Sequence, residues 1–409
     1  MKKKLIFLCD NYPIAAREFF VDDEMRVIAD RFEKVIVLTS AQNQDSNLHR
    51  YIPDNIVVEQ FSRKTMEDGK WKSLWKAILP IFLQELFFAI RLLPAKQWIS
   101  ALKIMYVELH RSKNVQQYIY GILKKHNLSV NQCIFYSYWH DYKAMALAML
   151  HKDNPESVCI ARAHGWDVFA ERQNPPYLPF KRFVIENLTK TISISEAGKK
   201  YFESYLSESF DEKIIVSRLG KFNHRTPLFE KTGNDVLICS CSNLIPVKRV
   251  DKIIDVLSNL QKNNLKWIHF GDGPLRAQLE QLANNKLTNC DFEFKGMVSN
   301  EKILNYYSEH FVDLFINLSD SEGIPVSIME ALSAGIPVLA TNVGGTAECV
   351  NAENGFLVEK NSSISEIATT IESFAKTDAT EKRQKAYEFW KGNYEARKNY
   401  NDFVAIINH

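Results

Sequence analysis

Short apolar runs alternate with stretches of helical periodicity along the first half of the chain. Apolar runs lie at 4–10, 34–40, 131–137, 156–165 and 189–195, and the first helical stretch covers 19–32. Runs without polar alternation are typical of strands that are buried on both faces. Because helices separate them, the pattern predicts an α/β unit built on a parallel sheet with helices on both faces.

The same alternation restarts near residue 214. Apolar runs lie at 214–220, 235–243, 266–273, 291–296, 313–319 and 336–341, and helical stretches at 250–263, 274–283 and 325–334. This pattern predicts a second doubly wound α/β unit, and we expect the two units to face each other across a cleft. Ligands of such sheets bind beyond the carboxyl ends of the strands, so the loops there should carry the site.

The most apolar segment is 71–93. Between Pro80 and Pro94 lie 13 residues, or about 20 Å of helix, whereas a bilayer core is about 30 Å thick. Two interpretations stay open: a pair of amphipathic helices packed on the domain, or a basic, tryptophan-bearing surface that lies on a membrane. The lysines that would face anionic lipid are Lys70, Lys72, Lys76, Lys96 and Lys103.

Charge and cysteine content narrow the class of protein. The 51 basic and 49 acidic residues leave a net charge of +2, which gives no support for a nucleic-acid binder. The seven cysteines are scattered and form no CxxC pair, so we expect buried free thiols in a reducing cytosol. The apolar run 5–9 is too short for a signal peptide.

The strongest motif is SDSEGIPVSIMEALSAGIPVLATNVGG at 319–345, a loop, helix and strand that follow an apolar run. Proline suits the first turn of a helix, and Gly335 suits the residue just past its end. The backbone N–H groups and the dipole at this helix start favour a phosphate. The positions that form the helix start are Gly323, Ile324, Pro325, Val326 and Ser327.

Two glutamates flank this helix start. Glu322 lies in the loop just before it, and Glu330 lies eight residues later within the helix. Two carboxylates beside an anion site suit the hydroxyl groups of a sugar, because carboxylate oxygens accept hydrogen bonds. The alternative is that Glu330 is a solvated helix residue and Glu322 a partner of the helix dipole.

The two glutamates, and EGIPVSIMEALSAGIPVLAT around them, resemble the signature of the retaining glycosyltransferases of family 4, which have the GT-B fold. The resemblance implies two Rossmann-like domains and a nucleoside-diphosphate sugar as donor, with UDP favoured over GDP. It implies that Glu322 contacts the donor sugar and that Glu330 holds the ribose.

The family's organisation also implies domain boundaries. Residues 1–217 would form an acceptor-side domain and 218–384 the domain that binds the sugar nucleotide. A C-terminal helix at 385–409 would pack back onto the first domain.

A lysine follows the first strand of the second unit. SNLIPVKRVD (242–251) resembles the family's strand, loop and helix with a lysine for the donor diphosphate, which falls on Lys248. A cation there would stabilise the leaving diphosphate as charge develops on it, and Arg249 could add to this. Ser242 and Asn243 stand where the family often has an arginine, which shifts that role to Arg249 or Arg218. The alternative is a solvated loop lysine.

Further segments resemble the family more loosely. HFGDGPLRAQLE resembles its GxGP turn and brings Gly273 to the donor, although a purely structural turn is an equal alternative. KGMVSNEKILNYY resembles the segment that lines the base pocket, which places Met297 and Val298 near the nucleobase. ARAHGWDVF resembles its HGxD segment, so His164 would face the reacting carbon, with Asp167 nearby; a structural histidine is the alternative.

The first loop departs from the family. Ala15 and Ala16 stand where many members have a Gly-Gly pair, and their Cβ atoms hinder close approach to the donor. The pattern around them resembles a polysaccharide-building subgroup, which implies that Arg17 and Glu18 line the acceptor site. His140 in SYWHDYKA either faces the cleft or has a packing role.

Together these features predict a retaining, metal-independent hexosyltransferase that moves a sugar from a nucleoside-diphosphate sugar to a glycan or lipid-linked acceptor. The subgroup resemblance implies capsule or exopolysaccharide biosynthesis in the cytoplasm, with peripheral membrane contact through 71–103. We expect no metal, since there is no Asp-x-Asp, and no cofactor besides the donor. A non-catalytic GT-B partner subunit and a nucleotide-sugar epimerase are the alternatives.

Overall fold

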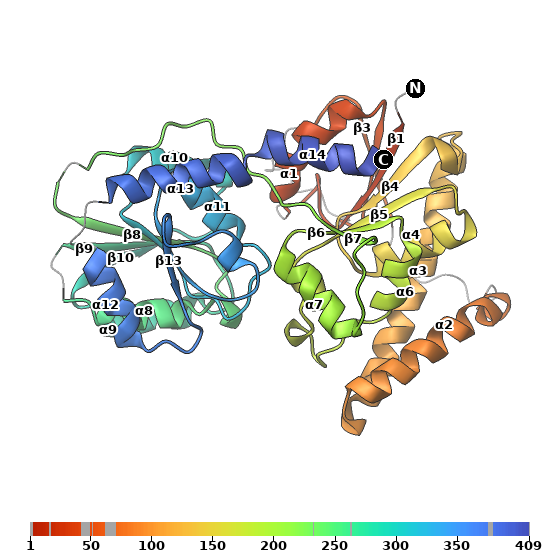
Figure 1. Ribbon diagram of the computed structural model, residues 1–409, viewed down its shortest axis with the longest axis horizontal. Coiled ribbons are helices and arrows are strands. Elements are labelled where there is room, and N and C mark those ends of the chain that lie inside the picture. Colours follow the sequence, from red (N-terminus) through yellow and green to blue (C-terminus); the bar gives the residue numbers. More distant parts are fainter. Residues whose placement is uncertain are drawn as a thin grey trace. The chain divides into compact units, whose positions relative to one another are not determined.

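The chain forms two compact units in the computed structural model (Figure 1): Met1–Arg218 with Tyr400–His409, and Leu219–Asn399. Each unit consists of a sheet with helices on both faces. The structure describes residues 3–15, 18–41, 50, 52–61, 71–231, 233–261, 264–374 and 379–408, of which 71–78 are described as backbone alone.

The first unit is built on a seven-stranded sheet in the order β3-β2-β1-β4-β5-β6-β7, and its strands pair in parallel. The strands are β1 (Lys4–Cys9), β2 (Val35–Thr39), β3 (Ile56–Gln60), β4 (Cys133–Ser137), β5 (Val158–Ala163), β6 (Lys190–Ser193) and β7 (Ile214–Val216). The helices are α1 (Phe20–Ile28), α2 (Trp71–Leu92), α3 (Trp98–Lys125), α4 (Tyr142–Asp153), α5 (Gly165–Val168), α6 (Lys181–Asn187) and α7 (Glu196–Leu206).

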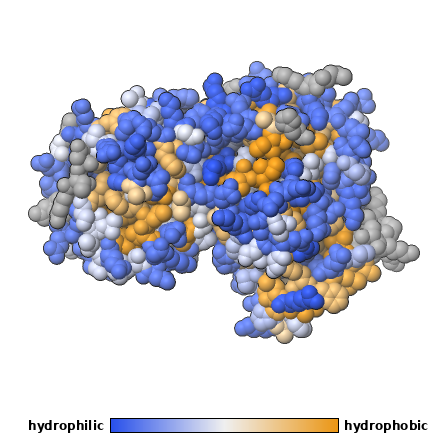
Figure 2. Space-filling model, in the orientation of Figure 1, coloured by the Kyte–Doolittle hydropathy of each residue, from blue (hydrophilic) through white to orange (hydrophobic). Residues whose placement is uncertain are grey.

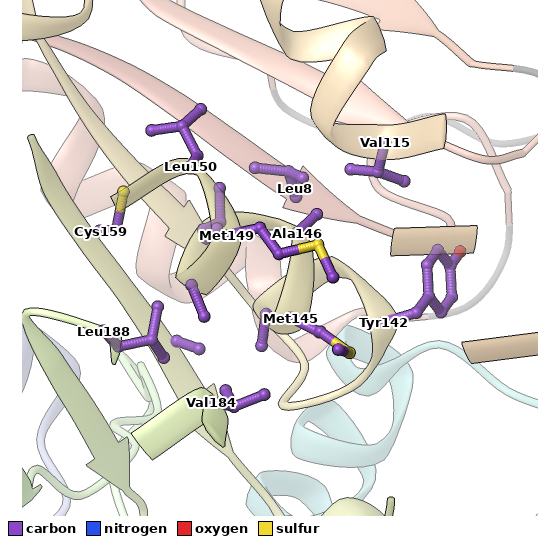
Figure 3. Packing of buried hydrophobic residues seen from close by; sticks show 14 of the residues in the cluster. Leu8, Val115, Tyr142, Met145, Ala146, Met149, Leu150, Cys159, Val184 and Leu188 are labelled. Carbon is purple, nitrogen blue, oxygen red and sulfur yellow. The ribbon is translucent and has the colours of Figure 1, made fainter. Parts of the chain in front are cut away.

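Helix α4 lies at the centre of this unit's core. Every residue from Tyr142 to Leu150 is buried, between Val115 of α3, Leu8 of β1 and Val184 of α6 (Figure 3). A helix that is covered on all sides needs no polar face. This burial explains why its sequence shows little amphipathic pattern.

The second unit is built on a six-stranded sheet in the order β10-β9-β8-β11-β12-β13, again paired in parallel. The strands are β8 (Val236–Cys241), β9 (Leu265–Phe270), β10 (Cys290–Phe294), β11 (Leu314–Asn317), β12 (Val338–Thr341) and β13 (Gly355–Val358). The helices are α8 (Val250–Ser258), α9 (Arg276–Lys286), α10 (Asn300–Glu309), α11 (Val326–Ser333), α12 (Ile364–Phe374) and α13 (Thr380–Asn393).

The two doubly wound units confirm the fold class predicted from the apolar runs. Sequence reasoning missed β3 and β13, and both are edge strands. The residues of β3 are half-buried or exposed, and only the ends of β13 are buried. An edge strand needs fewer apolar residues than a central one, so its sequence signal is weak.

Two helical segments differ from the expectation. Helix α2 runs from Trp71 to Leu92 through Pro80, whereas one interpretation of 71–93 was a pair of helices. The range 385–409 is also divided, because α13 ends at Asn393 and packs against α11 in the second unit. Helix α14 (Ala396–Asn408) follows, and its residues from Tyr400 onward belong to the first unit.

Among the helices of the described residues, none combines the length and the apolar character needed to cross a membrane.

Candidate active site

The loop after β11 leads into the start of α11. Pro325 has extended backbone dihedral angles and caps the helix, and its carbonyl accepts the first helical bonds from the N–H groups of Ile328 and Met329. The N–H groups of Val326 and Ser327 therefore precede the first intrahelical bond. This helix start has the donors and the dipole that favour an anion.

Lys248 and Glu322 form an ion pair at this helix start. Lys248 Nζ lies 2.7 Å from Glu322 Oε1, and Asn317 Nδ2 donates to the same oxygen at 3.3 Å. Glu322 is only 5% exposed. An ammonium group has three N–H donors, so Lys248 can hold Glu322 and still donate to a phosphate oxygen. The structure thus joins two residues that the motifs indicated separately.

Glu330 forms a second lysine–glutamate pair in the same unit. Lys221 Nζ lies 3.2 Å from Glu330 Oε1, and Asn300 Nδ2 donates to that oxygen as well. Glu330 is 2% exposed, so it is not a solvated helix residue. Sequence reasoning missed Lys221 and Asn300, because residues this far apart in the chain show no common spacing or periodicity.

Two glycines hold the Lys248 loop against the loop after β9. The N–H of Leu244 donates to the carbonyl of Asp272 at 3.0 Å. A Cβ on Gly273 would lie 2.6 Å from the Leu244 carbonyl oxygen, and one on Gly271, whose φ is +132°, would lie 1.9 Å from that of Ser242. This backbone approach requires residues without a Cβ, which gives Gly273 a structural role beside any contact with the donor.

Arg249 and the predicted base-pocket residues lie outside the two ion pairs. The Arg249 guanidinium is shared between Asp251 at 3.2 Å and Asp320 at 3.3 Å. Met297 and Val298 follow β10, where Met297 is 65% exposed and Val298 half-buried. Their roles towards a phosphate and a base stay predictions.

His164 lies in an aromatic pocket of the first unit. It follows β5, is 7% exposed, and its ring centroid lies 4.7 Å from those of Tyr138 and Trp139. Neither ring nitrogen has a hydrogen-bond partner among the described residues. Burial and the nearby positive charge of Arg162 lower the pKa of His164 well below 6.5. The imidazole is therefore neutral at physiological pH and has both a donor and an acceptor available.

Asp167 holds two loops of the first unit together. Its carboxylate accepts from the backbone N–H groups of His164 and His140, each at 2.6 Å. Burial raises the pKa of Asp167 to about 6. The His140 ring itself is buried, with Thr191 Oγ1 at 3.3 Å and Lys181 Nζ at 3.2 Å. Of the two interpretations that the sequence left open for His140, its burial therefore favours the packing role.

Glu18 has hydrogen-bond partners within the first unit, and its expected place in an acceptor site stays a prediction. It is buried, and its carboxylate accepts from the N–H groups of Asn11 at 2.6 Å and Tyr12 at 3.0 Å and from the Trp139 indole at 2.5 Å. These hydrogen bonds hold the first loop in place, together with Trp139, whose ring packs against His164. Arg17 and Ala16 lie outside the described residues.

The seven cysteines are free thiols, of which Cys241 is half-buried and the rest are buried. Burial raises the pKa of Cys241, and the charge of Glu330 adds to this, so the thiol stays protonated. In the part of the chain that the structure describes, no three His, Cys, Asp or Glu side chains are grouped to hold a metal ion.

Three buried histidines, His140, His164 and His269, predict a pH dependence of stability, and burial lowers the pKa of His269 to about 4. Burial keeps the pKa of His140 and His164 well below 6.5, so the unfolded chain takes up protons first as the pH falls through 6.5, and stability is lost. Between about pH 7 and pH 5 the free energy of unfolding should fall by up to about 1.4 kcal/mol per pH unit for each histidine. Asp167, with its raised pKa, opposes this in part.

Urea unfolding at several pH values measures this dependence. His164→Phe should have a shallower slope than the wild type, because one of the buried histidines is gone. The control His224→Gln changes an exposed histidine and should keep the wild-type slope. Equal slopes for all three proteins would contradict the expectation.

Comparison with known proteins identifies the second unit. Residues 225–390 match the family described as glycosyl transferases group 1. The match covers most of the second unit, and the resemblance to glycosyltransferases found in the sequence is confirmed.

The curated relatives point to the same family. The chain is 36% identical over 160 residues to the O-antigen biosynthesis glycosyltransferase WbnH of Escherichia coli. The aligned residues cover 36% of this chain and 44% of WbnH. The chain is 28% identical over 178 residues to the putative colanic acid biosynthesis glycosyltransferase WcaL of Salmonella typhimurium, covering 41% of this chain and 43% of the other. The chain thus spans less than half the length of these relatives.

The whole chain resembles solved glycosyltransferase structures. Anabaena Alr3699/HepE in complex with UDP and glucose has 17% identity and a TM-score of 0.67, with 99% of each chain covered. Sucrose-phosphate synthase from Thermosynechococcus elongatus has 12% identity and a TM-score of 0.74, covering 100% of this chain and 98% of that one. At these identities the likeness concerns the fold, and it confirms the predicted GT-B fold.

Proposed function

We propose that the protein is a retaining, metal-independent glycosyltransferase that moves a sugar from a nucleoside-diphosphate sugar to a glycan or lipid-linked acceptor. The observation that carries this proposal is the pair of lysine–glutamate contacts beside the start of α11, Lys248 with Glu322 and Lys221 with Glu330. They combine cations, carboxylates and a helix start within a group 1 glycosyltransferase segment.

The donor is held by the second unit in this proposal. The start of α11 and Lys248 take the diphosphate, because backbone N–H groups and an ammonium both donate to phosphate oxygens. Glu330 accepts from the ribose hydroxyls, and Lys221 and Asn300 hold its carboxylate in place. UDP is the favoured nucleotide, and HepE was solved with UDP and glucose.

Lys248 acts on the leaving group. When the bond from the anomeric carbon to the diphosphate oxygen breaks, negative charge develops on that oxygen, and a preorganised cation stabilises it without reorganisation. Glu322 orients the donor sugar by accepting hydrogen bonds from the hydroxyl groups of that sugar. Its ion pair with Lys248 couples sugar position to leaving-group stabilisation.

The acceptor completes the reaction without an enzymic nucleophile. Its hydroxyl oxygen attacks the anomeric carbon from the face that the diphosphate leaves, and its proton passes to the departing phosphate oxygen. The anomeric configuration is retained. His164 contacts the sugar or the acceptor as a neutral imidazole, which is consistent with its lowered pKa and its ring nitrogens without a partner among the described residues.

The biological setting is cell-surface polysaccharide assembly in this proposal. WbnH and WcaL are named for O-antigen and colanic acid biosynthesis. We place the reaction in the cytoplasm at the inner face of the membrane, where a lipid-linked acceptor is accessible.

A donor panel tests the function. UDP-glucose, UDP-galactose, UDP-N-acetylglucosamine and GDP-mannose are each incubated with the protein, and release of nucleoside diphosphate is measured. Turnover with retained configuration of the product, assigned by NMR, is expected for at least one donor. Tight binding without turnover would favour a non-catalytic partner subunit, and an epimerised sugar nucleotide would favour an epimerase.

Glu330→Gln should raise the KM for the donor about tenfold and change kcat less, because it removes a charged acceptor for the ribose but keeps the side-chain shape. The matched control Glu309→Gln changes an exposed glutamate at the end of α10 and should leave both constants unchanged. A wild-type KM in the Glu330 variant would contradict the ribose role.

A further inference from the structure

An apolar surface lies on the outer side of the hairpin that α2, a short 3-10 turn (Ala95–Gln97) and α3 form in the first unit. Large hydrophobic side chains are exposed there, and Figure 2 shows hydrophobic surface gathered over this part of the molecule. We call this set the hairpin surface: Leu79, Leu83, Phe87, Ile90, Leu92, Trp98, Ile99, Leu102, Tyr106 and Val107. Phe87 and Ile99 are the most exposed, at 65% and 69%.

The hairpin surface is additional to the face that packs on the domain. The inward side chains of the same helices, such as Ala89, Ala101 and Met105, are buried in the core. Both helices are therefore apolar on two faces, whereas a helix on a domain surface is normally polar outward. The second half of α3 follows that rule, since Arg111, Gln117 and Lys124 are exposed there.

The charges of the hairpin surface have one sign. In the fully described stretch 79–107 the exposed charged residues are Arg91, Lys96 and Lys103, all basic. The single acidic residue of the stretch, Glu85, points inward and accepts from the Tyr177 hydroxyl at 2.5 Å. Burial raises the pKa of Glu85, which further reduces its charge. The surface thus combines apolar area with net positive charge.

We propose that the hairpin surface docks the protein on a bilayer that contains anionic lipid. Apolar side chains would enter the interface, the basic groups would meet the headgroups, and Trp98 and Tyr106 suit the boundary between them. The charge argues for lipid over a second copy of this chain, because two copies would bring like charges together.

The hairpin surface would hold the proposed glycosyltransferase at the membrane, and in this respect the inference rests on the proposed function. Vesicle binding is measured without donor or acceptor. Its failure would therefore leave the transferase proposal standing, and failure of turnover would leave the docking surface standing.

Co-sedimentation of the full chain with vesicles tests the proposal. The wild type should bind vesicles of phosphatidylcholine mixed with phosphatidylglycerol more tightly than vesicles of phosphatidylcholine alone. Phe87→Glu/Ile99→Glu should weaken binding at least about tenfold, because two apolar side chains are lost from the interface. The control Gln117→Glu/Lys124→Gln makes the same charge change on exposed positions of α3 outside the surface and should bind nearly as the wild type.

A second variant tests the charge. Lys96→Gln/Lys103→Gln should weaken binding to the anionic vesicles by about fivefold for each residue and leave the neutral vesicles unaffected. Absence of wild-type binding, or equal wild-type binding to both vesicles, would overturn the proposal. So would a dimer in light scattering that Phe87→Glu/Ile99→Glu separates, since that result assigns the surface to a second copy.

Discussion

Lys248→Met is expected to lower kcat/KM by about 10²–10³-fold, the loss typical when one preorganised group that stabilises developing negative charge is removed. Methionine keeps most of the side-chain length without the charge. The variant also leaves the buried Glu322 carboxylate without its ion-pair partner, at 2.7 Å in the wild type. Steady-state kinetics with the best donor of the panel measures the effect.

Two further variants separate chemistry from folding in this experiment. Glu322→Gln keeps the shape and a hydrogen-bonding oxygen for Lys248, so it should fold normally and still lose activity through the donor sugar. Lys286→Met is the control, because Lys286 is exposed and pairs with Asp255 on the side of α8 and α9. A Lys248→Met enzyme with wild-type thermal unfolding and wild-type kcat/KM would remove Lys248 from the mechanism.

Arg162→Met is expected to destabilise the protein by about 3–5 kcal/mol, the cost of breaking a buried ion pair from one side. Arg162 and Glu24 are both fully buried, with Nη2 and Oε1 3.3 Å apart. The Tyr136 hydroxyl accepts from Arg162 Nε and donates to Glu24, each at 2.7 Å. Arg162 also donates to the Ser217 carbonyl at 3.0 Å and lies over the Phe403 ring at 4.4 Å.

The loss should be much smaller when both charges are removed. Burial raises the pKa of Glu24, and Arg162 is the main group that opposes this shift. In Arg162→Met the buried Glu24 carboxylate loses this stabilising positive charge. Arg162→Met/Glu24→Gln should recover part of the lost stability, because no unpaired charge stays buried. Denaturant unfolding of the two single variants and the double variant measures the coupling, and strict additivity would contradict the expectation.

Much of the fold could be predicted because central parallel strands are buried on both faces. Strands β1, β2, β4 and β8 appear in the sequence as nearly continuous apolar runs, and their order along the chain implies the sheets. The edge strands β3 and β13 could not be found in this way, since their residues are only partly covered. The continuation of α2 through Pro80 was also not predictable, because packing decides whether a helix tolerates a proline.

Part of the candidate site could likewise be predicted from the sequence, and part could not. The start of α11 was predictable from Glu322, Pro325 and Gly335, because capping and turn residues act within a few positions of the chain. The lysine partners of Glu322 and Glu330 were not predictable, and neither were the hydrogen bonds that the Glu18 carboxylate accepts from the first loop and from Trp139. Contacts between distant segments have no periodicity that a sequence reveals.

The amino-acid sequence by itself determined the two parallel sheets and the helix start beside Glu322. These follow from local spacing and from the apolar runs of buried strands. Only the tertiary structure decided that Lys248 pairs with Glu322, that Lys221 pairs with Glu330, that His164 lies among aromatic rings, and that the outer side of α2 and α3 stays exposed. Those features depend on which faces packing brings together, and that is a property of the folded chain.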